Sequence, residues 1–227
     1  MGRRAIFLDK DGTLIHDVPY NVDPTRMRLL PGAVEGLRRL QRAGYLLIVV
    51  TNQSGVARGL FSERALGAVE QRLRALLARA GIPLADFYYC PHHPDGTVLE
   101  YAVECACRKP QPGLIARAVH EHGLDPGRSW LIGDILNDVQ AGKLAGCRTI
   151  LLDNGGESEW LLNHRRLPDY VATDLREAAA IVSAADAGRP RSLHSTSRLL
   201  RRRILTDRTP AGAGSWGLPR LKERVYE

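Results

Sequence analysis

Apolar positions along residues 1–186 follow two spacings, which alternate along the chain. Continuous apolar runs at 4–9, 45–50, 87–90, 130–133 and 149–152 are typical of strands covered on both faces. Between them, apolar residues recur every three or four positions, which predicts helices. We expect these helices over 31–44, 62–81, from about 112, over 139–145 and over 174–185. Alternating strands and helices predict a central parallel sheet in a three-layer α/β fold.

Polar residues follow four of these strands. Asp9 and Asp11 come after the first, Thr51-Asn52 after the second, Cys90 after the third and Asp134 after the fourth. Ligands of open parallel sheets bind beyond the carboxyl ends of the strands, so these residues are expected to share one edge. A carboxylate at the end of a buried strand is costly unless positive charge lies beside it. The pattern predicts a site for a divalent cation and a phosphate.

Phosphoryl transfer needs a nucleophile, charge neutralisation and a proton donor. We predict Asp9 as the nucleophile and Asp11 as the group that protonates the leaving oxygen and then activates water. The Thr51 hydroxyl and the Lys109 ammonium are expected to stabilise the phosphoryl oxygens. Lys10, between the two acids, is expected to point away if the strand pleat continues.

Oxygen ligands at the same edge favour Mg²⁺. Asp9, the backbone carbonyl of Asp11, and Asp134 form a hard ligand set that suits this ion. Asp138, four residues after Asp134, has two interpretations that the sequence leaves open. It either orients the site or caps the helix that follows.

The cysteines predict a second metal. Cys90-x-His92 and Cys105-x-Cys107 flank a stretch of twelve residues. Four such ligands suit a closed, structural Zn²⁺ site that positions the following lysine. The alternative is a pair of buried thiols beside an incidental histidine. Cys147 is expected to be an inert core thiol.

The charge of the chain is unevenly distributed. The formal net charge is +7, and residues 187–227 hold ten Lys/Arg and three Asp/Glu, which leaves 22 residues of each sign in 1–186. We predict one domain over 1–186 and a basic, weakly ordered tail over 187–227, in which a short amphipathic helix around 199–205 is an alternative. Because the domain is neutral, no nucleic-acid partner is expected.

No apolar run approaches the length of about 20 residues that spans a bilayer. The start of the chain does not have the pattern of a secretory signal. We therefore expect a cytoplasmic protein with no membrane partner.

Four short motifs in a fixed order resemble the haloacid dehalogenase superfamily of phosphatases. They are D-x-D-G-T at 9–13, Thr-Asn at 51–52, Lys-Pro at 109–110 and G-D-x-x-x-D at 133–138. The resemblance covers residues 1 to about 185. It implies a Rossmann-like fold, an aspartyl-phosphate intermediate and dependence on Mg²⁺.

Longer strings around the cysteines resemble one branch of this superfamily, the phosphatases that remove the 7-phosphate of a heptose bisphosphate. The strings are TNQSGVARG at 51–59, YYCPHHPDG at 88–96 and CACRKPQPG at 105–113. The resemblance implies a small sugar bisphosphate as the substrate, and we expect a monomer. The substrate contacts that it implies are Asp17, Tyr20, Asn52, Gln53, Ser54 and Arg108. Ile135 is a departure, because lysine is common there in the family.

Two other activities are weaker hypotheses. A histidinol-phosphate phosphatase shares the acidic motif and a zinc loop, but its loop between the metal half-sites tends to be shorter than twelve residues. A phosphatase of nucleic-acid ends would use the basic tail, yet that tail offers only Trp216 and Tyr226 for stacking on bases.

Overall fold

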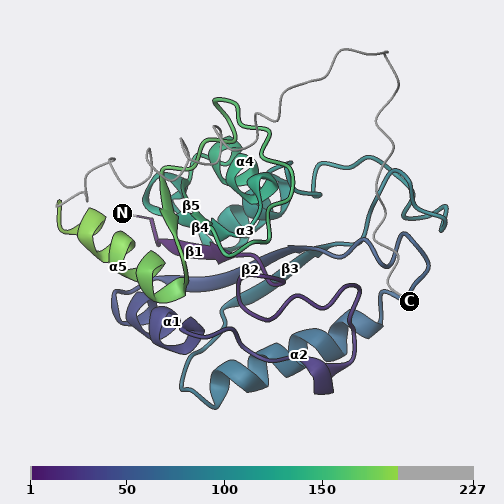
Figure 1. Cartoon of the computed structure of the whole chain (residues 1–227), viewed down its shortest axis with the longest axis horizontal. Helices are drawn as coiled ribbons and strands as arrows, with labels where there is room; N and C mark the ends of the chain where they lie inside the picture. Colours follow the sequence, from purple (N-terminus) through teal and green to yellow (C-terminus); the bar gives the residue numbers. More distant parts are fainter. Residues whose placement is uncertain (1, 189–227) are drawn as a thin grey trace, which may run out of the picture.

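The structure is a computed structural model, and it describes residues 2–188. Its centre is a six-stranded sheet in the order β3-β2-β1-β4-β5-β6, in which every neighbouring pair is parallel (Figure 1). The strands are β1 (Ala5–Leu8), β2 (Leu46–Asn52), β3 (Asp86–Cys90), β4 (Trp130–Gly133), β5 (Arg148–Leu152) and β6 (Tyr170–Ala172). The helices are α1 (Ala33–Arg42), α2 (Ala65–Ala78), α3 (Gly113–His122), α4 (Leu136–Leu144) and α5 (Leu175–Asp186).

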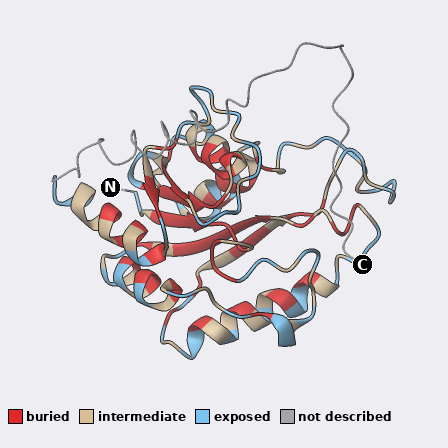
Figure 2. Ribbon diagram, viewed as in Figure 1, coloured by how far each residue is buried: buried red, intermediate tan, exposed pale blue. Residues whose placement is uncertain are grey.

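Alternate residues of the strands supply two apolar cores, one on each face of the sheet. Ile6 and Leu8 of β1 pack with apolar residues of α1, α2 and α5. Ala5 and Phe7 face the other way and pack with residues of α3 and with Ala141 of α4. The strands are therefore buried along almost their whole length (Figure 2). The predicted three-layer α/β fold is confirmed.

The parallel register brings the carboxyl ends of the central strands together. Leu8, the last residue of β1, pairs with Val49 of β2 and Ile132 of β4. The Asp9 amide then donates a hydrogen bond to the Ile132 carbonyl, with an N–O distance of 3.1 Å. This contact places Asp9 beside the loop that follows β4.

Most predicted elements are found with ends shifted by a few residues, and two helix starts and one strand differ for a physical reason. Helix α2 begins at Ala65 rather than at Ser62, because a turn over 62–64 comes first and Ser62 makes no side-chain cap. Helix α4 begins at Leu136, because Asp138 accepts a hydrogen bond from the Ile135 amide and so caps the helix earlier. Strand β6 was not predicted, since three residues are too few to show a period.

The tail falls almost wholly outside the described residues. Both the weakly ordered segment and the alternative helix around 199–205 therefore stay predictions, as does the division of the chain at residue 186. Within residues 2–188, no helix is long and apolar enough to cross a membrane.

Candidate active site

The deepest part of the site is an ion pair around Asp9, which follows β1. The Lys109 ammonium lies 2.6 Å from Asp9 Oδ1 and 2.6 Å from Asp138 Oδ1. Lys109 is 2% exposed and Asp138 is fully buried. Burial disfavours the charged amine, but the carboxylates of Asp138 and Asp9 outweigh it and raise the pKa of Lys109. The structure thus brings a permanent cation to the predicted nucleophile.

Three carboxylates meet at this point. Oxygen atoms of Asp9, Asp134 and Asp138 lie within 4.8 Å of one another. Burial, together with the charges of Asp9 and Asp138, raises the pKa of Asp134 to about 8. Burial likewise raises the pKa of Asp138 to about 6, against the effect of Lys109. Buried like charges of this kind fit a hard divalent cation such as Mg²⁺, which the predicted pair Asp9 and Asp134 would hold with the Asp11 carbonyl.

Asp138 has both of the roles that the sequence left open. One of its oxygens accepts from the Ile135 amide at 3.3 Å, which caps α4. The other oxygen pairs with Lys109. Asp138 therefore links the start of α4 to the lysine.

The carboxylate of Asp134 is enclosed by backbone and side chain. The Thr13 hydroxyl donates to Asp134 Oδ1 at 3.0 Å. A Cβ atom at Gly12, where φ is +73°, or at Gly156 would lie 2.1 Å from Asp134 Oδ2, so both glycines are needed for this close approach. The Asn154 amide donates to the Gly12 carbonyl at 2.6 Å and holds the two loops together. Sequence reasoning missed the loop after β5, because a Gly-rich loop there has no motif of its own.

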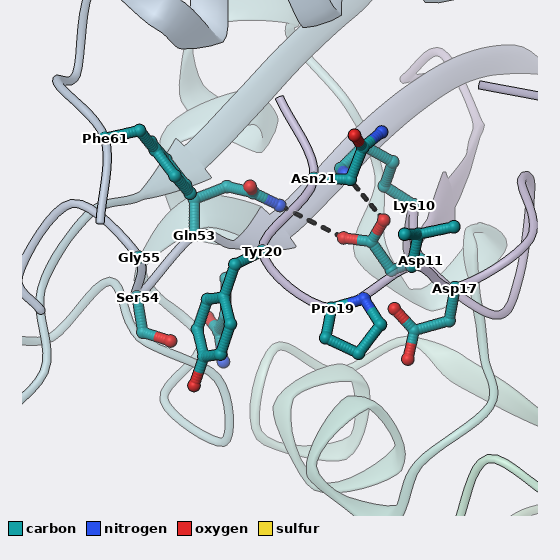
Figure 3. A pocket seen from close by; sticks show the side chains of 12 residues that line it. Lys10, Asp11, Asp17, Pro19, Tyr20, Asn21, Gln53, Ser54, Gly55 and Phe61 are labelled. Carbon is teal, nitrogen blue, oxygen red and sulfur yellow. Dashed lines mark hydrogen bonds and ion pairs between the residues drawn. The ribbon is translucent and has the colours of Figure 1, made fainter. Parts of the chain in front are cut away.

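Asp11 is held by two donors (Figure 3). The Lys10 ammonium lies 2.6 Å from Asp11 Oδ1, and Gln53 Nε2 lies 3.2 Å from Oδ2. Burial raises the pKa of Asp11, with Asp9 adding to the effect and Lys10 opposing it. The condition on which Lys10 was expected to point away, a continuing strand pleat, is not met. Because β1 ends at Leu8, the pleat does not continue, and Lys10 folds against Asp11 with 2% exposure.

A pocket of about 280 Å³ opens beside Asp11, just below the range of about 300–1,000 Å³ for small-molecule sites. Five of the six predicted substrate contacts line it, and Arg108 is not among its lining residues. Tyr20 reaches the pocket from a left-handed backbone with φ of 54°, a strained geometry for a non-glycine residue. The lining comprises Lys10, Asp11, Asp17, Val18, Pro19, Tyr20, Asn21, Asn52, Gln53, Ser54, Gly55 and Phe61 (Figure 3).

The Asn52 side chain has a contact that the sequence did not predict. Its Nδ2 donates to the Lys109 carbonyl at 2.9 Å, and its Oδ1 accepts from the Lys109 amide at 3.0 Å. Both ends of the amide thus bind one backbone unit, much as a neighbouring strand would. This pair of bonds fixes where the lysine side chain starts.

The predicted zinc ligands gather at the end of β3. The three sulfurs of Cys90, Cys105 and Cys107 lie 3.1–3.5 Å apart, and His92 Nδ1 lies 3.4–3.6 Å from the sulfurs of Cys107 and Cys90. A tetrahedron with Zn–S bonds of 2.3 Å has edges of roughly 3.7 Å, so this donor set fits zinc. All four cysteines are free thiols, and burial raises the pKa of Cys147, away from the cluster, to about 12.

Comparisons with known proteins agree with this geometry. A family model described as HAD-hydrolase-like matches residues 106–178. D-glycero-β-D-manno-heptose-1,7-bisphosphate 7-phosphatase of Pasteurella multocida is 43% identical over 154 residues, which cover 67% of this chain and 83% of the relative. The chain belongs to this phosphatase family. The family member from Photorhabdus laumondii is 37% identical over 192 residues, which cover 85% of this chain and 96% of that relative.

A solved structure supports the same assignment. The D,D-heptose 1,7-bisphosphate phosphatase of B. bronchiseptica, in complex with magnesium and phosphate, is 32% identical with a TM-score of 0.65. The match covers 80% of this chain and 99% of that one. The predicted superfamily and Rossmann-like fold are therefore confirmed, and the protein is a phosphoric monoester hydrolase.

Proposed function

We propose that this phosphatase removes the 7-phosphate of D-glycero-D-manno-heptose 1,7-bisphosphate, a step in making nucleotide-activated heptose for a surface polysaccharide. The observation that carries the proposal is the position of Asp9. This buried carboxylate is held by Lys109 at 2.6 Å and lies at the same strand edge as the pocket beside Asp11. The heptose bisphosphate named for the relatives is a substrate of the class that such a site accepts.

In the proposed first step, an oxygen of Asp9 attacks phosphorus while the bond to the sugar oxygen breaks. The electron pair leaves with that oxygen, which takes a proton from Asp11. In the second step, water attacks phosphorus and gives its proton to Asp11. The bond to Asp9 then breaks, which releases inorganic phosphate.

Two groups of this chain, together with the Mg²⁺ that it would hold, offset the charge on the phosphoryl oxygens. Lys109 provides a fixed ammonium, the Thr51 hydroxyl provides a donor, and Asp9 with Asp134 and the Asp11 carbonyl would hold Mg²⁺. When bound, Mg²⁺ supplies positive charge that offsets the phosphate oxygens. Zinc on the cluster at 90–107 would be structural, since its four protein ligands leave no open position.

The sugar would occupy the pocket lined by Asp17, Tyr20, Gln53 and Ser54, with Asn52 at its edge. Arg108 lies just before the catalytic lysine, and its guanidinium donates to the His92 carbonyl at 3.3 Å. Its remaining donors are suited to the second phosphate of the substrate. We propose a monomeric, cytoplasmic enzyme whose partner is this small molecule, with neither nucleic acid nor membrane involved.

The test is a phosphate-release assay with the purified chain on the α and β anomers of the bisphosphate, with histidinol phosphate as the competing substrate. We expect turnover of a heptose bisphosphate, and the relatives' name favours the β anomer. Asp9→Asn is expected to be inactive. Full activity of that variant would exclude Asp9 as the nucleophile. Faster turnover of histidinol phosphate would exclude heptose bisphosphate as the preferred substrate.

A further inference from the structure

One amide group connects two of the proposed catalytic side chains. Gln53 Nε2 lies 3.2 Å from Asp11 Oδ2 and 3.0 Å from Thr51 Oγ1 (Figure 3 shows the first contact). The Gln53 side chain is 6% exposed, and its backbone amide donates to the Cys90 carbonyl at 2.8 Å. The side-chain amide of Gln53 is thus held in place by the anchored backbone of this residue and by its contacts with Asp11 and Thr51.

The direction in which the amide faces suits the chemistry of its partners. Gln53 presents its NH₂ group to both Asp11 and Thr51, and this is the end that an Asp11 carboxylate can accept from once it has given up its proton. The two hydrogens of the NH₂ group then serve one partner each, Asp11 and Thr51. Because Thr51 Oγ1 accepts from Gln53, its own hydroxyl hydrogen is free to donate elsewhere. Thr51 therefore presents a donor, as a phosphate oxygen requires.

We propose that Gln53 is a positioning residue that orients the Asp11 carboxyl for proton transfer and turns the Thr51 hydroxyl toward the phosphoryl group. This inference rests on the proposed roles of Asp11 and Thr51 and adds to the sugar contact proposed for Gln53. The Lys10 ammonium lies 2.6 Å from the other oxygen of Asp11, so each carboxyl oxygen has its own hydrogen-bond donor. Among residues 2–188, Gln53 is the one whose side chain hydrogen-bonds to both Asp11 and Thr51.

The inference separates two effects that an experiment can measure. In kcat/KM, which covers the steps up to cleavage of the ester bond, the orientation of Asp11 matters only where the leaving oxygen needs a proton; its later role toward water affects kcat equally for all esters. The Thr51 donor matters for every phosphate ester, because the phosphoryl group is the same. A series of aryl phosphates, from p-nitrophenyl phosphate to phenyl phosphate, varies the need for a proton while keeping that group constant.

The experiment compares Gln53→Leu and Gln53→Glu with the unaltered enzyme on this series and on heptose bisphosphate. General acid catalysis contributes about 10²–10⁴-fold, so a misoriented acid is expected to lower kcat/KM about 30-fold or more for phenyl phosphate. For p-nitrophenyl phosphate we expect only about a threefold loss, the share of Thr51. Gln71→Leu on the exposed side of α2 is the control for the substitution itself.

The Asp11→Asn background makes the test specific. When Gln53→Leu is added to Asp11→Asn, we expect the rate to fall only about threefold on every ester. No acid remains to be oriented, so only the effect through Thr51 is left. Equal losses across the series, or a rise in KM for the sugar with kcat unchanged, would overturn the inference. Thermal melts show whether Gln53→Leu folds. If it does not, the same comparison across the series is made with Gln53→Glu, whose side chain has the same size. If the aryl phosphates react and heptose bisphosphate does not, the proposed substrate fails while the series still tests Gln53.

Discussion

Lys109→Met tests whether one buried ammonium holds the acidic centre together. Lys109 is 2% exposed and lies 2.6 Å from oxygens of both Asp9 and Asp138. Methionine fills a similar volume but leaves the two carboxylates buried without their cation. Removing one partner of a buried ion pair costs about 3–5 kcal/mol. We expect the free energy of unfolding to fall by about this amount in urea titrations with a chelator present.

The chain offers a matched control for this variant. Lys143 also pairs with an aspartate, Asp169, but these side chains are 27% and 31% exposed. Accessible pairs contribute about 0–1 kcal/mol, so Lys143→Met is expected to change the free energy of unfolding by no more than that. Adding Asp138→Asn to Lys109→Met removes one of the orphaned charges and is expected to restore part of the loss. If Lys109→Met proved as stable as Lys143→Met, the assignment of a charged, buried centre would be refuted.

Four further outcomes are expected. Asn52→Leu removes both hydrogen bonds to the Lys109 backbone and is expected to lower kcat about 10–100-fold in steady-state kinetics, with little change in KM. An effect on KM alone would make Asn52 a sugar contact instead. Removing zinc with a strong chelator is expected to lower the melting temperature and to speed amide hydrogen exchange over residues 90–107. Metal analysis that finds no zinc in the purified protein would contradict the assignment. Gly156→Ala places a Cβ atom 2.1 Å from an Asp134 oxygen and is expected to weaken Mg²⁺ binding about 10-fold or more by calorimetry, whereas unchanged affinity would show that the loop yields freely. Gly67→Ala adds a Cβ atom in open space in the first turn of α2 and is expected to stabilise the fold by about 0.5 kcal/mol or less in urea titrations, whereas a loss of stability would show that the position needs glycine.

The sequence predicted the parts of the site that depend on strand periodicity. Asp9, Thr51 and Asp134 each follow a buried apolar run, and a parallel sheet necessarily brings the ends of such runs to one edge. The zinc cluster was predictable for a different reason, because the x-spaced ligand pairs form a local pattern. Both features are visible along the chain without knowledge of its packing.

The rest depends on contacts between distant residues. The direction of Lys10 follows from where β1 ends, which the apolar run at 4–9 does not define to one residue. The bonds from Asn52 to the Lys109 backbone and from Gln53 to Asp11 and Thr51 are side-chain choices that become fixed only once the loops are packed. The enclosure of Asp134 by Gly156 likewise depends on a loop with no motif of its own.

The Asn52 amide also divides the chain into parts that can evolve separately. The excursion from β3 leaves at Cys90 and returns at Lys109, and its return point is fastened by Asn52 and the cluster of thiols. Insertions or deletions within 93–104 therefore leave the lysine where it is. We therefore expect the length of this excursion to be adjustable without moving the ammonium of Lys109 away from Asp9.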